Sequence, residues 1–282
     1  MMRTSMKCVG LLLFVLGCAC ASTKPLPTEP VPPHQTFTLD SAKLKEPRPI
    51  NVYLPPGYAA SGDTRFPVLY MPDGGLKEDF PHLATTVDTA IRAGELRPVI
   101  IVGIENTVRR RDMTGPTTVA TDLEVAPVTG GSATFRAFIH EELMPEVERR
   151  YRVTQERAII GESLAGYFIV ETFFLQPDLF DTYLALSPSL WWNAESLVNG
   201  AGEWLATHPD LRAGIYLSSA DETDIGPAVA RLQESLRANA PAGLKWEVEP
   251  RPDLRHDNIY RQSSPGVLRK WLPPVATTNA TP

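Results

Sequence analysis

The fold is decided by the segment Arg157-Ala158-Ile159-Ile160-Gly161-Glu162-Ser163-Leu164-Ala165-Gly166. Apolar residues lead into Gly-x-Ser, and a second apolar run follows the serine directly, which predicts a strand, a sharp turn and a helix. A serine in such a turn is held above a sheet edge, as in the nucleophile elbow G-x-S-x-G. Ala165 stands at the fifth position, and the glycine comes one residue later. Because an isolated G-x-S is often a plain turn, the rest of the chain has to decide.

Composition limits the possible classes of protein. The 282 residues are 43% hydrophobic and 21% charged, which suits a globular chain with one large domain or two small ones. A formal net charge of −6 and the lack of a basic stripe argue against a nucleic-acid surface. The sequence has five histidines and three cysteines but no H-E-x-x-H, paired C-x-x-C or P-loop. We therefore expect no metal and no organic cofactor.

The N-terminal residues 1–21 have the pattern of an export signal. A positively charged start precedes an apolar core at 9–16 that is too short to span a bilayer. Val15-Leu16-Gly17-Cys18 resembles a bacterial lipobox and predicts lipidation of Cys18, whereas Ala19-Cys20-Ala21 resembles an ordinary A-x-A cleavage site. We favour a lipoprotein, in the periplasm or anchored to the outer membrane by its lipid, over a secreted protein. Either cleavage removes Cys8, and residues 22–282 contain no cysteine, so we expect a fold without disulfides.

The remaining sequence divides into three parts. Residues 22–35 are rich in proline and predict a semi-rigid tether. Residues 36–272 carry the periodic apolar pattern of one folded domain, and residues 273–282 predict a disordered tail. We expect strands at 36–40, 48–54, 66–71, 98–104, 157–161, 183–187, 214–219 and 244–249, and helices at 83–93, 135–151, 164–175, 195–207, 226–239 and 265–271.

This order of elements predicts the fold class. Two early strands joined by a turn, followed by alternating strands and helices, indicate an α/β domain with a mainly parallel sheet of about eight strands and helices on both faces. Active sites in such sheets lie at the carboxyl ends of the strands, where Ser163 falls. The helix at 135–151 should bend at Pro145, which cannot donate a backbone hydrogen bond.

A serine hydroxyl becomes a good nucleophile when a positioned base takes its proton. In hydrolases with a nucleophile elbow the partners follow in the order serine, acid, histidine. His256 is the one histidine that follows both of the last two expected strands, so we expect it to be the base. Asp221, Glu222 and Asp224 follow the strand at 214–219, and spacing alone does not choose the acid among them.

An oxyanion formed by serine attack needs two backbone N–H donors in place. We expect one from Leu164, directly after the serine. The other should come from the loop after the strand at 66–71, where Gly74 or Gly75 would let the backbone approach a substrate closely. A Gly-Gly pair is also common in plain turns.

Two adjacent tryptophans follow the strand at 183–187. Trp191 and Trp192 cannot both be buried in one core unless the backbone there is irregular. We expect one to pack and the other to face the cleft, where it could stack on an acyl or aromatic group. Two packing residues under a loop is the alternative. The short connection around them predicts little or no lid.

An arginine run, Arg109 to Arg111, lies in the loop after the strand at 98–104. Arg110 and Arg111 could receive an anionic or catechol-rich substrate. Alternatively, the run is solvated or paired with the nearby carboxylates of Glu105 and Asp112.

Several segments resemble one family, the esterases of the α/β-hydrolase fold that include esterase D and the enterobactin-type siderophore esterases. The resemblance spans residues 36–272, and Ser187-Pro188-Ser189-Leu190-Trp191-Trp192 is its most distinctive part. It implies Ser163 as nucleophile, His256 as base and Glu222 as the acid. The other matching segments are Val52-Tyr53-Leu54-Pro55-Pro56-Gly57-Tyr58, Pro67-Val68-Leu69-Tyr70 with Asp73-Gly74, Arg110-Arg111-Asp112-Met113-Thr114, Glu142-Leu143-Met144-Pro145 and the elbow itself.

Together these observations predict an exported serine esterase that acts on a small-molecule ester, siderophore-type or other, through an acyl-enzyme. Within the same family, acyl transfer to an alcohol and thioester hydrolysis stay open. A surface-anchored binding module that has lost turnover is the alternative outside the enzymes.

Overall fold

The computed structural model describes residues 30–274. The expected export signal, the lipidation of Cys18, the tether up to residue 29 and the tail from residue 275 lie outside the described residues and stay predictions. The strands are β1 (His34–Ser41), β2 (Glu46–Tyr53), β3 (Phe66–Pro72), β4 (Ile100–Ile104), β5 (Val153–Glu162), β6 (Thr182–Leu186), β7 (Gly214–Ser219) and β8 (Lys245–Pro250). They form one sheet in the order β1-β2-β4-β3-β5-β6-β7-β8.

Helices connect these strands. The α-helices are α1 (Phe80–Arg92), α2 (Arg109–Met113), α3 (Ala120–Val125), α4 (Ser132–Phe138), α5 (Met144–Arg150), α6 (Leu164–Leu175), α7 (Trp192–Ala206), α8 (Ile225–Asn239) and α9 (Ile259–Trp271); η1 (Tyr58–Ala60) is a 3-10 turn and η2 (Ile139–Leu143) a π-helical one. No helix within residues 30–274 is long and apolar enough to cross a membrane.

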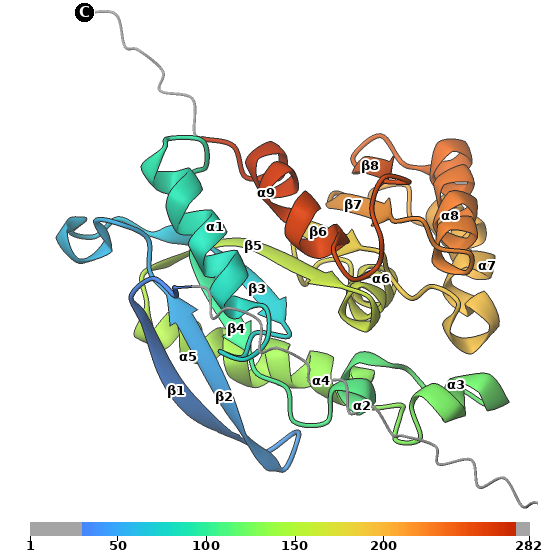
Figure 1. Cartoon of the computed structure of the whole chain (residues 1–282), viewed down its shortest axis with the longest axis horizontal. Coiled ribbons are helices and arrows are strands. Elements are labelled where there is room, and N and C mark those ends of the chain that lie inside the picture. Colours follow the sequence, from blue (N-terminus) through green and yellow to red (C-terminus); the bar gives the residue numbers. More distant parts are fainter. Residues whose placement is uncertain (1–29, 275–282) are drawn as a thin grey trace, which may run out of the picture.

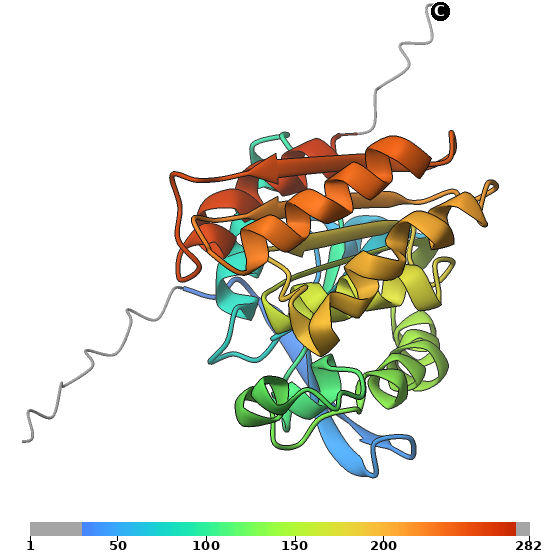
Figure 2. The ribbon, with the colours of Figure 1, turned by 90° about the vertical axis from the view of Figure 1, so that its right-hand side faces the viewer.

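Helices cover both faces of the sheet, which confirms the predicted fold class (Figure 1). Strand side chains alternate between two apolar clusters, as the two-residue period of a strand requires. Ile159 packs in the cluster beneath α4 to α8, whereas Ile160 packs in the cluster beneath α1 and α9. Figure 2, turned by 90°, shows α7 and α8 lying side by side along the first of these faces.

The direction of the strands places the functional edge of the sheet. β1 and β2 are antiparallel to their neighbours, and β3 to β8 are parallel. The carboxyl ends of β3, β5, β6, β7 and β8 therefore meet at one edge. β6 lies between β5, which leads to Ser163, and β7, which leads to the three candidate acids.

The structure has a π-helical turn near Pro145, where the sequence predicted a bend. α4, η2 and α5 form one continuous helical segment, and its π-helical turn Ile139–Leu143 comes directly before the proline. A proline lacks the N–H that would bond to the carbonyl four residues earlier, and the wider π turn accommodates this gap.

Two sequence expectations about helices were wrong. The last helix begins at Ile259, six residues before Pro265, which lies inside it. Buried Ser263 and Ser264 belong to the stripe that faces the core, so this stripe did not show in the apolar pattern. The short helices α2 and α3 were not expected, because five or six residues are too few to show a helical period.

Candidate active site

Ser163 occupies a strained turn between β5 and α6. Its backbone has φ 58° and ψ −121°, a conformation that a non-glycine residue rarely adopts. The turn is fixed on two sides: the N–H of Ser163 donates to the Leu186 carbonyl (3.1 Å), and its carbonyl accepts from the Tyr167 N–H (2.8 Å). The segment that decided the fold is thus a nucleophile elbow that presents the hydroxyl above the sheet edge.

Ala165 is accommodated because its neighbours are small. A Cβ added to Gly161 would lie 2.8 Å from the Ala165 Cβ, so Gly161 provides the space that the alanine methyl fills. A Cβ added to Gly166 would lie 3.0 Å from the Pro188 Cα. The close backbone approach in this elbow therefore falls at Gly166.

Ser163, His256 and Glu222 form a continuous hydrogen-bond chain. His256 lies in the loop between β8 and α9, and its Nε2 is 3.1 Å from the Ser163 Oγ. Its Nδ1 contacts the Glu222 carboxylate. Because an ionised carboxylate only accepts, Nδ1 carries the proton and Nε2 is free to accept from the serine. This arrangement is the one that a general base needs.

The structure separates the three carboxylates that spacing left open. Glu222 is the one that contacts His256, and its side chain is only 7% exposed. Asp224 accepts from the Ile225 N–H (2.9 Å) and caps α8. Asp221 is exposed, and its backbone N–H donates to the Leu254 carbonyl. Neither aspartate takes the position of the acid.

Hydrogen bonds set the charge states of the pair. Burial alone would raise the pKa of Glu222, but hydrogen bonds from His256, Ser187 and the Ala220 N–H outweigh it and hold this pKa below its usual value. Glu222 in turn raises the pKa of His256 above its ordinary value of 6.5, against burial and with help from Glu162. The carboxylate thus stabilises the imidazolium that proton transfer creates.

A small cleft opens above the triad. Its volume is about 240 Å³, and it is lined by Ser163, Ser189, Trp191, Glu222, Asp224, Ile225 and His256. The His256 side chain is 46% exposed, so a substrate can reach the base from solvent.

The two tryptophans have the split arrangement that we expected. Trp192 is fully buried, and its indole N–H donates to the Gly115 carbonyl (3.1 Å). Trp191 is half-buried and forms part of the cleft wall. The two rings contact each other, with their centroids 5.9 Å apart. The chain then continues through three left-handed residues, Asn193 to Glu195. A role of Trp192 in substrate binding is not supported; that of Trp191 stays a prediction.

The expected oxyanion donors differ in availability. The Leu164 N–H is the first of α6, where no carbonyl of the same helix can accept it. The Gly74 N–H donates to the Ile104 carbonyl (2.9 Å), and a Cβ here would lie 2.2 Å from the Ile104 nitrogen. Gly74 was thus a wrong choice, because its backbone completes the sheet. The Gly75 N–H donates to the Glu78 carboxylate (2.7 Å), which an oxyanion would have to displace.

A network of polar side chains holds the loop that carries these glycines. Asp73, itself left-handed with φ 57°, accepts from Arg109 Nε (2.6 Å) and Nη2 (2.8 Å). Asn106 bridges the Asp73 and Glu78 carboxylates. Of the arginine run, Arg109 therefore lies beside the site, where it fixes the loop after β3.

Arg110 and Arg111 are engaged elsewhere, contrary to the expectation that they bind substrate. Arg111 pairs with Asp112 (2.7 Å) and Glu46 (2.8 Å), and Arg110 donates to the Val125 carbonyl. Neither is among the described residues that line the cleft at Ser163. The pairing alternative fits the structure better, with Asp112 as the partner that the sequence offered.

Three residues that the sequence did not single out also belong to this site. The Ser189 hydroxyl lies 3.4 Å from that of Ser163, and the Ser187 hydroxyl donates to Glu222 (3.0 Å). Glu162, directly before the nucleophile, has a buried carboxylate oxygen without a partner. The distinctive Ser-Pro-Ser segment indicated that this part of the chain is important, but nothing in the sequence predicted which residues the two serines contact.

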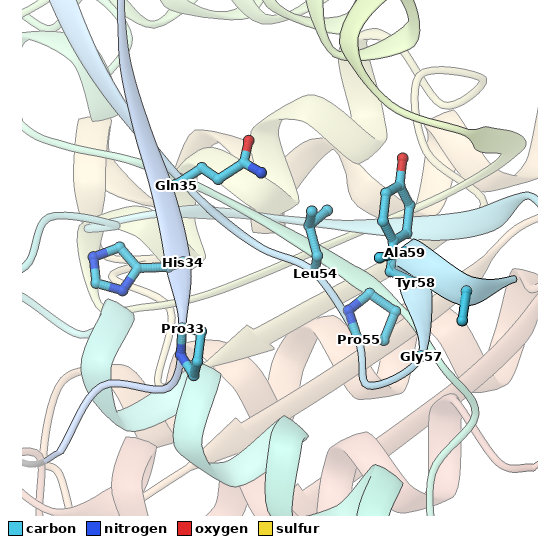
Figure 3. Close-up of a pocket in the computed structure, with 9 residues that line it drawn as sticks. Pro33, His34, Gln35, Leu54, Pro55, Gly57, Tyr58 and Ala59 are labelled. Carbon is cyan, nitrogen blue, oxygen red and sulfur yellow. The ribbon is translucent and has the colours of Figure 1, made fainter.

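Another cavity lies at the opposite edge of the sheet, away from the triad. It measures about 420 Å³, and Figure 3 shows its wall, formed by the start of β1 and the segment after β2. Tyr53 at the end of β2 pairs with Ile101 near the start of β4, so this cavity is at the amino ends of the parallel strands, away from Ser163. Within residues 30–274 no group of three or more His, Cys, Asp or Glu side chains could hold a metal ion.

Comparison with known proteins agrees with this geometry. The model of the family described as "Putative esterase" matches residues 41–260. A ferri-bacillibactin esterase of Bacillus subtilis, BesA, is 34% identical over 148 residues, which are 45% of this chain and 49% of that protein. A siderophore enterobactin esterase of Emericella nidulans is 40% identical over 93 residues, 29% of this chain and 31% of that protein. The matched regions thus span about half or less of these relatives.

A solved structure extends the likeness to the whole domain. The IroE-like serine hydrolase from Shewanella oneidensis superposes with a TM-score of 0.78 at 26% identity, over 85% of this chain and 80% of that one. The match of the family model covers the elbow, the acid and the histidine loop. This chain belongs to the esterase family of α/β-hydrolases that its sequence resembles.

Proposed function

We propose that this protein is a serine carboxylic-ester hydrolase that acts through an acyl-enzyme. The observation that carries the proposal is the hydrogen-bond chain from Ser163 through His256 to Glu222, placed beside an open cleft. One relative is named a ferri-bacillibactin esterase and another a siderophore enterobactin esterase, and this supports ester hydrolysis.

In the acylation step, each of the three residues of the hydrogen-bond chain has its own role. His256 Nε2 takes the proton of the Ser163 hydroxyl as Oγ bonds to the ester carbonyl carbon. The negative charge that develops on the carbonyl oxygen is stabilised by the Leu164 N–H, and Glu222 stabilises the imidazolium. When the tetrahedral intermediate collapses, the bond to the alkoxy oxygen breaks and His256 returns its proton to the departing alcohol.

Deacylation repeats these steps with water. His256 takes a proton from water, whose oxygen bonds to the acyl carbon of the Ser163 ester. The bond to Oγ then breaks, the carboxylic acid leaves, and Oγ regains its proton from the imidazolium. No cofactor enters either step.

We propose a siderophore-type ester as the substrate. The names of the two relatives motivate this choice. The half-buried indole of Trp191 in the cleft wall fits the aromatic acyl arm of such a molecule, because offset stacking favours aromatic pairs.

Comparing an enterobactin-like trilactone with p-nitrophenyl acetate and butyrate on the same preparation tests both levels of the proposal. We expect hydrolysis of all three, with the highest kcat/KM for the trilactone. A clear preference for the simple esters would reject the siderophore class and keep the esterase. Absence of hydrolysis, together with absence of labelling at Ser163 by a fluorophosphonate, would favour the non-catalytic binding module.

We also propose that the chain is exported and anchored by lipid at Cys18. The lipobox at residues 15–18 motivates this proposal. Mass spectrometry of the mature N-terminus from the native membrane fraction should find a lipidated Cys18, whereas a mature start at Ser22 would contradict lipidation.

A further inference from the structure

The turn that follows β6 lies between the nucleophile and the acid. β6 pairs with β5 on one side and with β7 on the other, so its end reaches both. The Ser189 N–H donates to the Ser163 carbonyl (3.0 Å), and the Ser187 N–H donates to the Ser218 carbonyl (2.9 Å). This single turn therefore connects the two strand ends that carry the triad.

Ser187 makes a close set of contacts with the acid. It is fully buried, and its backbone has φ 38°, in the left-handed region. Its hydroxyl accepts from the Ala220 N–H (3.1 Å) and donates to Glu222 Oε2 (3.0 Å). The Ala220 N–H occupies an acceptor site of the hydroxyl, so the one hydroxyl proton is directed to the carboxylate.

The two oxygens of Glu222 thus have separate tasks. Oε1 contacts His256 Nδ1, and Oε2 is held by Ser187 and by the Ala220 N–H (3.1 Å). The Ala220 N–H is shared between the serine and the carboxylate, so Ser187 supplies the one undivided donor to Oε2. Without that donor the carboxyl group could rotate about its last torsion and take Oε1 away from the imidazole.

We propose that Ser187 is a positioning residue that fixes the Glu222 carboxylate against His256. The inference rests on the proposed esterase function, and it adds a fourth member to the chain of hydrogen bonds. Ser187 does not touch substrate; it acts through Glu222, so its removal should weaken proton transfer and leave substrate binding intact.

The test is Ser187→Ala in the full chain, with Ser264→Ala as the matched control. Ser264 is equally buried and makes one side-chain hydrogen bond, to His82 (3.1 Å), outside the triad. For Ser187→Ala we expect kcat to fall roughly 10- to 100-fold with KM unchanged, as for a slightly misplaced catalytic group. For the control we expect both constants to stay near those of the wild type.

The pH profile and NMR separate positioning from a general loss of structure. Glu162 and Asp224 also act on the charge of His256, and Arg255 and Asp257 flank it in its own loop, but all four are unchanged in Ser187→Ala. Loss of the Glu222 contact should move the acid limb of kcat/KM to lower pH. It should also weaken the low-field proton resonance of Nδ1. A merely structural role would lower the melting temperature and leave both signals in place.

A double-mutant cycle completes the test. In a Glu222→Ala background Ser187 has no carboxylate to position, so adding Ser187→Ala should lower kcat by less than a further twofold. An equal loss in both backgrounds, or an unshifted Nδ1 resonance in Ser187→Ala, would overturn the proposal. If the wild-type chain hydrolyses no ester, the proposed function fails, yet the Nδ1 resonance still reports whether Ser187 holds Glu222.

Discussion

The two halves of the site around Ser163 are built in opposite ways. In the proton-transfer half, at the ends of β5 to β8, Ser163, His256 and Glu222 each contact the partner that catalysis requires. In the oxyanion half, the loop after β3, the polar groups satisfy one another: the N–H groups of Gly74 and Gly75 are both engaged within the protein.

The difference follows from what each half depends on. Strand order brings the ends of β5 and β7 to either side of β6, so the nucleophile and the acid start from neighbouring positions. Backbone donors, in contrast, depend on the torsions of a few loop residues. In this conformation the hydrogen bonds of the proton-transfer half are therefore all formed. The Gly75 N–H, in contrast, can bind an oxyanion only if the Glu78 carboxylate moves away.

The largest effect should come from removing the nucleophile or the base. Ser163→Ala and His256→Ala should each lower kcat on p-nitrophenyl butyrate on the order of 10⁴-fold or more, because the two act as one unit. Circular dichroism should show both variants folded. Retention of activity in Ser163→Ala would show that Ser163 is not the nucleophile, and the contrast between the two halves would then have no bearing on catalysis.

Replacing the acid should give the next largest effect. Glu222→Gln should lower kcat roughly 10²- to 10⁴-fold, whereas Asp221→Asn should change it less than twofold, because only the former orients the imidazole. Glu222 raises the pKa of His256, so the acid limb of the wild-type profile should lie above pH 6.5 and move to lower pH in Glu222→Gln. Comparable losses in the two variants would mean that the acid has been misassigned.

Truncating the wall of the cleft should affect binding more than turnover. Trp191→Ala should raise KM for a substrate with an aromatic acyl group by roughly three- to tenfold, through loss of stacking. Trp191→Phe keeps an aromatic face and should restore most of the affinity. Equal effects on p-nitrophenyl acetate would show that the indole supports the fold and does not recognise the acyl group.

The oxyanion half can be tested by releasing the Gly75 N–H. Glu78→Ala removes the carboxylate that holds it and should raise kcat by roughly two- to tenfold, because a free donor stabilises the oxyanion. Glu78→Gln retains an acceptor oxygen and should behave like the wild type. An unchanged kcat in Glu78→Ala would indicate that Gly75 takes no part in the reaction.

A separate effect should appear in stability, at Glu162, which lies between the two halves. Burial raises the pKa of Glu162 to about 7, against the opposing charge of His256 and with help from Asp79. In an unfolded chain glutamate titrates near about 4.3. Between these values the folded protein binds more protons than the unfolded one, so stability is lost as pH rises, and the loss is complete above about 7.

Glu162→Gln should remove that pH dependence. Its melting temperature should exceed that of the wild type at pH 8, and the difference should shrink towards pH 4, where the glutamate is protonated in both states. Thermal unfolding at a series of pH values measures this. Parallel curves for the two proteins would show that the carboxyl group is not destabilised by the fold.

The sequence predicted most of the sheet because apolar runs and chain order carry that information. β3, β4, β6 and β7 lie where near-continuous apolar runs placed them. α2 and α3 were missed because very short helices have no period, and α9 was shortened because Pro265 resembled a helix start. Thus the elements that position the nucleophile were predictable, whereas the irregular segments that line the site were not.

For the site, predictability depended on whether a role follows from chain order. His256 was the one histidine in the right place, and three dimensions were needed only to find its partner. Spacing did not choose Glu222 from a crowded turn, whereas the family resemblance did, and the backbone conformation that turns Asp224 into a helix cap agrees with that choice. The contacts of Ser187 depend on a left-handed torsion, and no residue pattern announces such a torsion at a serine.

The left-handed residues have a consequence for how this protein can evolve or be engineered. Asp73, Ser163 and Ser187 end the adjacent strands β3, β5 and β6, and each has a positive φ that favours glycine. Replacing any of these residues by glycine would relieve backbone strain and raise the stability of the domain, but each of these side chains makes contacts that the site needs. Selections for thermostable variants should therefore find stabilising substitutions at these three strand ends only in variants with reduced catalytic activity.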